Sequence, residues 1–111
     1  MEITDELIVT TLHDAYEATD DAYYYATMHD ASSDILQTLK DAKQHAFLAY
    51  IRASKRMLIH VTATTEAKVK ELLEKIKELK GELKTLKEVS VIVQNVAQIL
   101  ALIGIIITAF V

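Results

Sequence analysis

Apolar side chains recur at alternating steps of three and four residues through the first half of the chain, which is the spacing of one face of an α-helix. Between residues 8 and 26 these positions are Ile8, Leu12, Ala15, Thr19, Ala22 and Ala26. Between residues 35 and 53 they are Ile35, Leu39, Ala42, Ala46, Ala49 and Ala53. The pattern predicts two helices whose inner faces are lined mainly by alanine, so that they can approach each other closely.

The ends of these two helices are predicted from capping residues. Thr4 is a favourable N-cap for the first helix, because Asp5 and Glu6 follow it and place negative charge at the positive end of the helix dipole. Residues 30–34 are rich in Ser and Asp but contain neither Gly nor Pro, so we predict a turn there. The alternative is one unbroken helix from Thr4 to His60. A second break is predicted at residues 61–65, where threonines disfavour helix and Thr64 or Thr65 can cap the next one.

The second half of the chain repeats apolar positions in a heptad pattern. The a and d positions are Val69, Leu72, Ile76, Leu79, Leu83 and Leu86. The same frame continues through Ser90, Val93, Ala97, Leu100, Gly104, Ile107 and Val111. We therefore predict one helix from Thr65 to Phe110, about 45 residues and roughly 68 Å long. Residues 1–88 would form an antiparallel bundle of three helices, and residues 89–111 would project beyond it as an apolar helical extension.

The extension, residues 89–111, contains no charged side chain. As a helix it would be roughly 34 Å long, which is enough to cross a hydrocarbon core of about 30 Å. The leading interpretation is a membrane-embedded helix, and the alternative is a helix buried at the centre of a large protein assembly. Lys80, Lys84 and Lys87 precede the extension, so the positive-inside rule predicts that the bundle lies on the cytoplasmic side. The acidic start of the chain does not resemble a signal peptide and agrees with that prediction.

Small and polar residues within the extension follow a single helical stripe. They are spaced by four, three, four, three and four residues: Ser90, Gln94, Ala97, Ala101, Gly104 and Thr108. In membrane helices such residues mark helix–helix contacts, because small side chains let two backbones approach and polar ones form hydrogen bonds. The stripe predicts self-association. Side-chain amides without hydrogen-bond partners are unfavourable inside a bilayer. Those of Gln94, Asn95 and Gln98 would therefore either form hydrogen bonds between copies or face a water-filled lumen.

Tyrosines cluster at the end of the first helix, which the predicted topology brings close to the start of the extension. Because Tyr is enriched at membrane interfaces, the membrane-interface candidates are Tyr23, Tyr24, Tyr25, Lys84 and Lys87. The alternative is that these rings fill the bundle core or face water.

Composition and charge narrow the class of protein. The chain of 111 residues has no Pro, no Cys and only two Gly, which favours an all-α fold and excludes disulfides. Residues 1–39 carry nine acidic and no basic side chains, whereas residues 40–88 carry all twelve Lys and Arg, so the first helix is expected to lie beside basic ones. A net charge of −4 without a basic cluster argues against a nucleic-acid partner.

Catalytic patterns are not found in the sequence. The four histidines lack metal-ligand spacing, and no Gly-rich phosphate loop occurs. We therefore expect a protein that is not an enzyme and that has no cofactor, metal or small-molecule substrate. The predicted function is that of a structural subunit of a homo-oligomeric helical assembly in or against a membrane, such as a virion, filament or scaffold. The alternatives are a pore-forming or holin-like membrane protein, and a soluble helical assembly, natural or designed, with residues 89–111 as its buried core.

Overall fold

The computed structural model describes residues 4–55 and 62–108, and these residues form four helices. They are α1 (Asp5–Met28), α2 (Ser33–Lys55), α3 (Ala63–Lys84) and α4 (Val89–Ile107). The predicted all-α antiparallel bundle is confirmed, and it contains four helices where the sequence pattern predicted three. The predicted helix ends at His60 and Phe110 lie outside the described residues.

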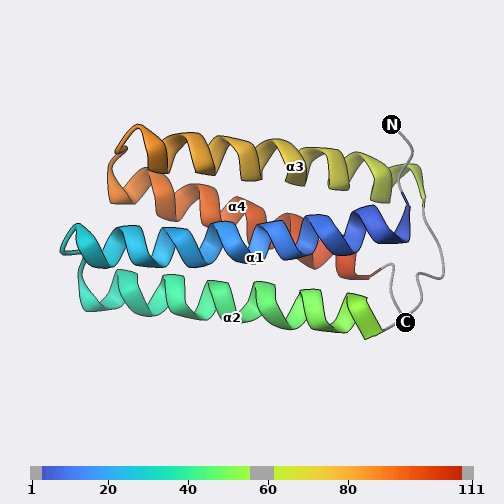
Figure 1. The fold of residues 1–111 in the computed structure, drawn as a ribbon, viewed down its shortest axis with the longest axis horizontal. Coiled ribbons are helices and arrows are strands. Elements are labelled where there is room, and N and C mark those ends of the chain that lie inside the picture. The colour runs from blue at the N-terminus through green and yellow to red at the C-terminus, as the bar shows by residue number, and fades with distance from the viewer. Residues whose placement is uncertain (1–3, 56–61, 109–111) are drawn as a thin grey trace.

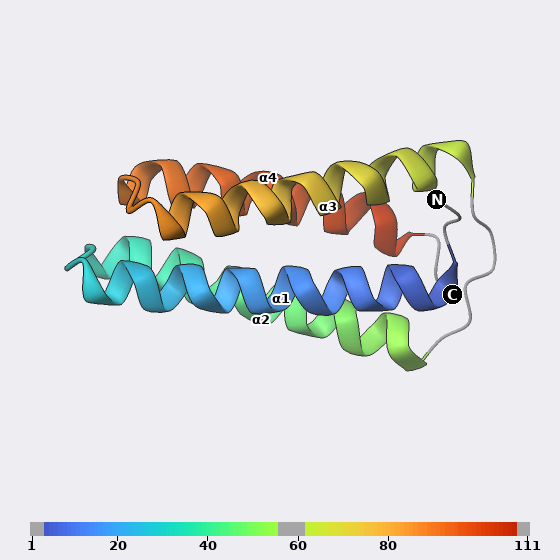
Figure 2. The same cartoon turned by 45° about the horizontal axis from the view of Figure 1, so that its top comes forward.

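The bundle consists of two helical hairpins packed side by side. In Figure 1, the α1–α2 turn and the α3–α4 turn lie at the same end of the molecule. Helix α1 contacts α2 and α3, α4 contacts the same two helices, and α1 and α4 also contact each other. Figure 2 shows this arrangement in a rotated view. We call the end that holds both turns the turn end. The acidic helix α1 therefore lies between α2 and α3, the two helices that carry basic residues. This position was predicted from the acidic composition of residues 1–39.

The core of the bundle contains the alanine-rich stripes that the spacing predicted. All six stripe positions of α1 are buried, and so are five of the six in α2. Only Ile35, in the first turn of α2, is partly exposed. The Thr4 side chain accepts a hydrogen bond from the Leu7 amide at 3.1 Å, which confirms the predicted N-cap. For α3 the cap is Thr62 and not Thr64 or Thr65, because the helix begins earlier than predicted.

The prediction of one continuous third helix is wrong. Helix α3 ends at Lys84, and the chain reverses so that α4 packs back along the bundle instead of projecting from it. The reversal depends on Leu86, which adopts the left-handed region with φ 58°. The Lys87 amide then donates to the Glu82 carbonyl at 3.1 Å, which closes a Schellman motif. The α1–α2 turn is built in the same way around Asp30, with φ 54°.

Burial of apolar surface explains why the chain folds back. The buried side chains of α4 are Ile92, Asn95, Val96, Ile99, Leu102, Ile103 and Ile106. Each buried aliphatic side chain stabilises the fold by about 1.5–3 kcal/mol relative to exposure, and their sum exceeds the cost of one left-handed residue. The heptad frame does not continue into this face. Ser90, Ala97 and Gly104, which would have been seam positions, are exposed.

Replacing Leu86 with Gly should stabilise the folded chain. A residue with a Cβ atom costs about 1–2 kcal/mol in the left-handed region, and Gly avoids that cost. Because Leu86 is 70% exposed, little packing is lost. We expect Leu86→Gly to raise the free energy of unfolding by about 1 kcal/mol, measured by urea denaturation. The neighbouring Thr85 has φ −92°, so Thr85→Gly is the matched control and should lower stability. Equal effects of the two substitutions would refute this account of the turn.

Candidate interaction surface on the outer face of α4

Helix α4 has two faces of different chemistry. Its inner face is aliphatic and packs against the other three helices. Its outer face carries the small and polar stripe predicted from the spacing, and all six members are exposed: Ser90, Gln94, Ala97, Ala101, Gly104 and Thr108. We call this stripe the α4 outer face. The role of the α4 outer face in contacts between copies stays a prediction.

The α4 outer face lacks charge along its whole length, because Val89–Ile107 contains no Asp, Glu, Lys or Arg. The three other helices all carry charged side chains on their exposed faces. A solvent-exposed helix gains solubility from such charges, and a helix that docks against another helix must lose water from its surface. The absence of charge therefore removes the largest desolvation cost that docking on α4 would have.

A groove flanks the C-terminal half of the α4 outer face on each side. Between α2 and α4 the groove is lined by His45, Leu48, Ala49, Arg52, Leu100, Ile103, Gly104 and Ile107. Between α3 and α4 it is lined by Lys68, Glu71, Lys75, Gln98, Ala101, Leu102 and Ile105. Gly104 thus opens into one groove and Ala101 into the other. A ridge of small residues between two grooves is the shape that ridges-into-grooves helix packing requires.

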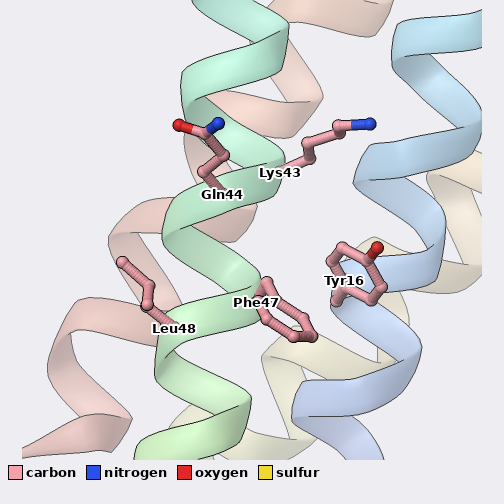
Figure 3. Close-up of a pocket in the computed structure, with 5 residues that line it drawn as sticks. All are labelled: Tyr16, Lys43, Gln44, Phe47 and Leu48. Atoms are coloured by element: carbon pink, nitrogen blue, oxygen red, sulfur yellow. The ribbon is translucent and has the colours of Figure 1, made fainter.

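Exposed apolar side chains extend this surface on both sides. Leu48 of α2 is 64% exposed and lines the α2–α4 groove, while Ile105 is 43% exposed and lines the α3–α4 groove. Leu48 also borders a shallow hollow shown in Figure 3, where the rings of Phe47 and Tyr16 lie 5.1 Å apart. Phe47 and Leu48 were not among the residues predicted from the sequence. Two large adjacent apolar residues outside the alanine stripe of α2 were the signal that could have revealed them.

The membrane-interface candidates gather at the turn end of the bundle. The Tyr25 hydroxyl donates to the Lys87 carbonyl and so connects α1 to the α3–α4 turn. Tyr24, Tyr25 and Lys84 line one hollow between α1 and α3. The predicted proximity of the tyrosine cluster to these lysines is therefore observed, and contact with lipid stays a prediction.

Electrostatic contacts tie the tyrosine cluster to α2. Lys43 forms an ion pair of 2.9 Å with Asp20 of α1, and its ammonium group lies 4.8 Å from the centre of the Tyr23 ring. The hydrogen bond with Asp20 raises the pKa of Lys43 above its usual 10.5. The ion pair between Lys43 and Asp20 joins the acidic helix α1 to α2, which carries basic side chains.

Asp21 should give a small pH-dependent effect on stability. Its pKa is raised above 3.8 first by partial desolvation of the carboxyl group, which is otherwise exposed, and then by the charges of Asp20 and Glu17. A carboxyl whose pKa is raised on folding favours the fold below pH 3.8, and that contribution is lost as the pH rises through the raised pKa. Asp21→Asn should therefore stabilise the protein at pH 7, by no more than about 0.5 kcal/mol because the site is exposed. Thermal unfolding should show no gain below pH 3.8, and a gain of equal size there would contradict the assignment.

Asn95 is the one polar side chain on the inner face of α4. It is 4% exposed, and its amide nitrogen donates to the Glu82 carboxylate of α3. Its side-chain oxygen is buried and has no hydrogen-bond partner among residues 4–55 and 62–108. Gln94 and Gln98, the other two amides, are exposed. The Asn95–Glu82 bond therefore marks the register in which α4 packs on α3.

No protein-family model matches this chain, and neither a curated protein nor a solved structure matches it. Within residues 4–55 and 62–108, no group of three His, Asp or Glu side chains is placed to hold a metal ion. Helix α4, with a mean hydropathy of 2.2, is the one helix in these ranges that is long and apolar enough to cross a membrane. The core helix of a soluble protein meets the same criterion.

Proposed function

We propose that this protein is a non-enzymatic structural subunit that assembles with copies of itself through the α4 outer face. One observation carries the proposal. The six residues that the spacing singled out all lie on the exposed side of a helix that has no charged side chain. Such a face can pack against another helix without burying a charged group.

The chemistry of the α4 outer face fits close helix packing. Ala97, Ala101 and Gly104 present little side-chain bulk, so a second helix can approach the backbone. Gln94 and Gln98 can exchange hydrogen bonds with their counterparts on a second copy. The flanking grooves would receive the larger side chains Leu48 and Ile105 of the neighbouring molecule.

The second candidate function is that of a membrane-embedded subunit, and the length and hydropathy of α4 favour it. In that form α4 would leave the bundle and span the bilayer, with Lys84 and Lys87 at the cytoplasmic interface. The closed bundle gives this candidate less support, because the aliphatic face of α4 is turned inward and its more polar face is turned outward. A pore would be a special case in which the outer face lines water.

Membrane fractionation followed by sizing tests the proposal. After expression, membranes are washed with carbonate, and the soluble protein is sized by light scattering with and without detergent. We expect a soluble homo-oligomer that does not need detergent. A monomer at all concentrations would refute the proposal. Protein that stays in washed membranes would favour the second candidate, and dye release from liposomes would then distinguish a pore from a non-leaking scaffold.

A further inference from the structure

We propose that two copies of this chain exchange helix α4. In the exchanged dimer the α3–α4 turn straightens, and each α4 fills the α4 position in the bundle of the other copy. Exchange involves the α3–α4 turn and the inner face of α4. It does not rest on the proposed association through the α4 outer face, which stays available in both forms.

The α3–α4 turn is the first observation in favour of exchange. It contains neither Gly nor Pro, and its left-handed residue is Leu86, for which this conformation is unfavourable. The N-cap of α4, Glu88, forms no side-chain capping hydrogen bond. Residues 85–88 are all compatible with a helix, so straightening removes the unfavourable conformation and adds helical hydrogen bonds. A short connection under strain is the usual origin of domain exchange.

The inner face of α4 explains why a second copy must be the partner. Its aliphatic side chains fill the core between α1, α2 and α3, so a lone chain cannot release α4 without exposing that core. The α4 of a second copy restores every one of these contacts, including the bond from Asn95 to Glu82. Exchange therefore preserves the core contacts and removes the unfavourable left-handed conformation of Leu86.

The turn end provides the second observation. Because α4 runs antiparallel to α3 in the closed bundle, a straightened α3–α4 helix places the second bundle beyond the turn end, with its own turn end facing the first (Figure 1). The side chains exposed there include Met28 at 81%, Leu86 at 70%, and Tyr24. Met28 and Leu86 bury little of their surface in the closed chain, and the end-to-end dimer would bring the two sets of side chains together.

A disulfide between α3 and α4 tests the exchange directly, because the chain has no cysteine of its own. In Glu82→Cys/Asn95→Cys the two thiols replace side chains that are in contact. After refolding at high concentration and oxidation, exchange links two chains, and a non-reducing gel should show a covalent dimer at twice 12.5 kDa. The control Asp20→Cys/Lys43→Cys joins α1 to α2 and should stay at the mass of one chain. A monomer band for both variants would overturn the proposal.

A distance measurement keeps the test independent of disulfide formation. Glu71 and Gln98 are exposed and line the same groove in the hairpin, whereas a straight helix would separate them by about 40 Å. Spin labels on Glu71→Cys/Gln98→Cys, diluted with unlabelled protein, should show the long distance in the dimer. Leu86→Gly should weaken this dimer on the order of a hundred-fold, because Gly favours the turn and disfavours the straight helix.

The outcomes separate this proposal from the one above. An oligomer by light scattering with a short distance within each chain would overturn exchange and leave association through the outer face intact. A long distance that appears only after lipid vesicles are added would also overturn exchange, and it would favour a membrane-spanning α4.

Discussion

Ile99→Ala should lower the free energy of unfolding by about 2–5 kcal/mol. Ile99 lies at the centre of α4 and is completely buried in the bundle. Removing its side chain loses the transfer free energy of three carbon atoms and leaves a cavity that neighbouring helices fill only in part. For a domain whose total stability is about 5–15 kcal/mol, this loss is a large fraction. Urea denaturation followed by circular dichroism measures it.

This experiment decides whether α4 belongs to the core of the bundle. If α4 instead projected away from α1, α2 and α3, truncation of Ile99 would leave their unfolding transition unchanged. Ile105→Ala is the matched control, since it removes the same atoms from the same helix at a position that is 43% exposed. We expect the control to cost less than about 1 kcal/mol. Equal losses at both positions would contradict the burial pattern of α4.

Ala97→Leu combined with Gly104→Leu should break the homo-oligomer while the chain stays folded. Both residues lie on the α4 outer face, and a Cβ atom added at Gly104 meets no other described residue within 4 Å. The larger side chains therefore have space in a monomer. Between two copies they would force the helices apart, at a cost of about 1–3 kcal/mol per overpacked site. We expect association to weaken on the order of a hundred-fold, measured by light scattering over a concentration series.

The matched control places the same substitutions on α3. Ala67 and Gly81 are exposed, and Gly81 also has free space around an added Cβ atom. Ala67→Leu combined with Gly81→Leu should therefore leave the oligomer unchanged. An oligomer of unaltered size in the α4 variant would remove the basis of the proposed function. If the α3 variant weakened association equally, the effect would come from added side-chain bulk in general and not from the α4 outer face.

The inner faces of the first two helices could be predicted because they depend on local spacing. Ile8, Leu12 and Ala15 recur at helical steps, and a helix with that pattern buries one face in almost any bundle. The first turn could also be predicted, since Ser32 and Asp34 are capping residues. The six residues of the α4 outer face were found as a stripe for the same reason, and their spacing alone placed them on one side of a helix.

The second turn had no such local signal. No residue that breaks a helix occurs in this turn, which consists of Thr85, Leu86, Lys87 and Glu88. The heptad frame passes through the turn without interruption. Only the structure shows that Leu86 takes a left-handed conformation there and that α4 reverses. Because α4 reverses, the face that it buries differs from the face that the predicted heptad seam required. Ala97 and Gly104 are exposed, whereas Ile99 and Leu102 are buried.

The sequence by itself thus determined that the chain is helical, where most helices lie and which residues share a face, because each of these follows from interactions over a few residues. The tertiary structure alone decided that α4 folds back and which of its faces points inward. That choice depends on the apolar surface that α4 buries against three helices distant in the sequence, and this gain exceeds the local cost of turning the chain at Leu86.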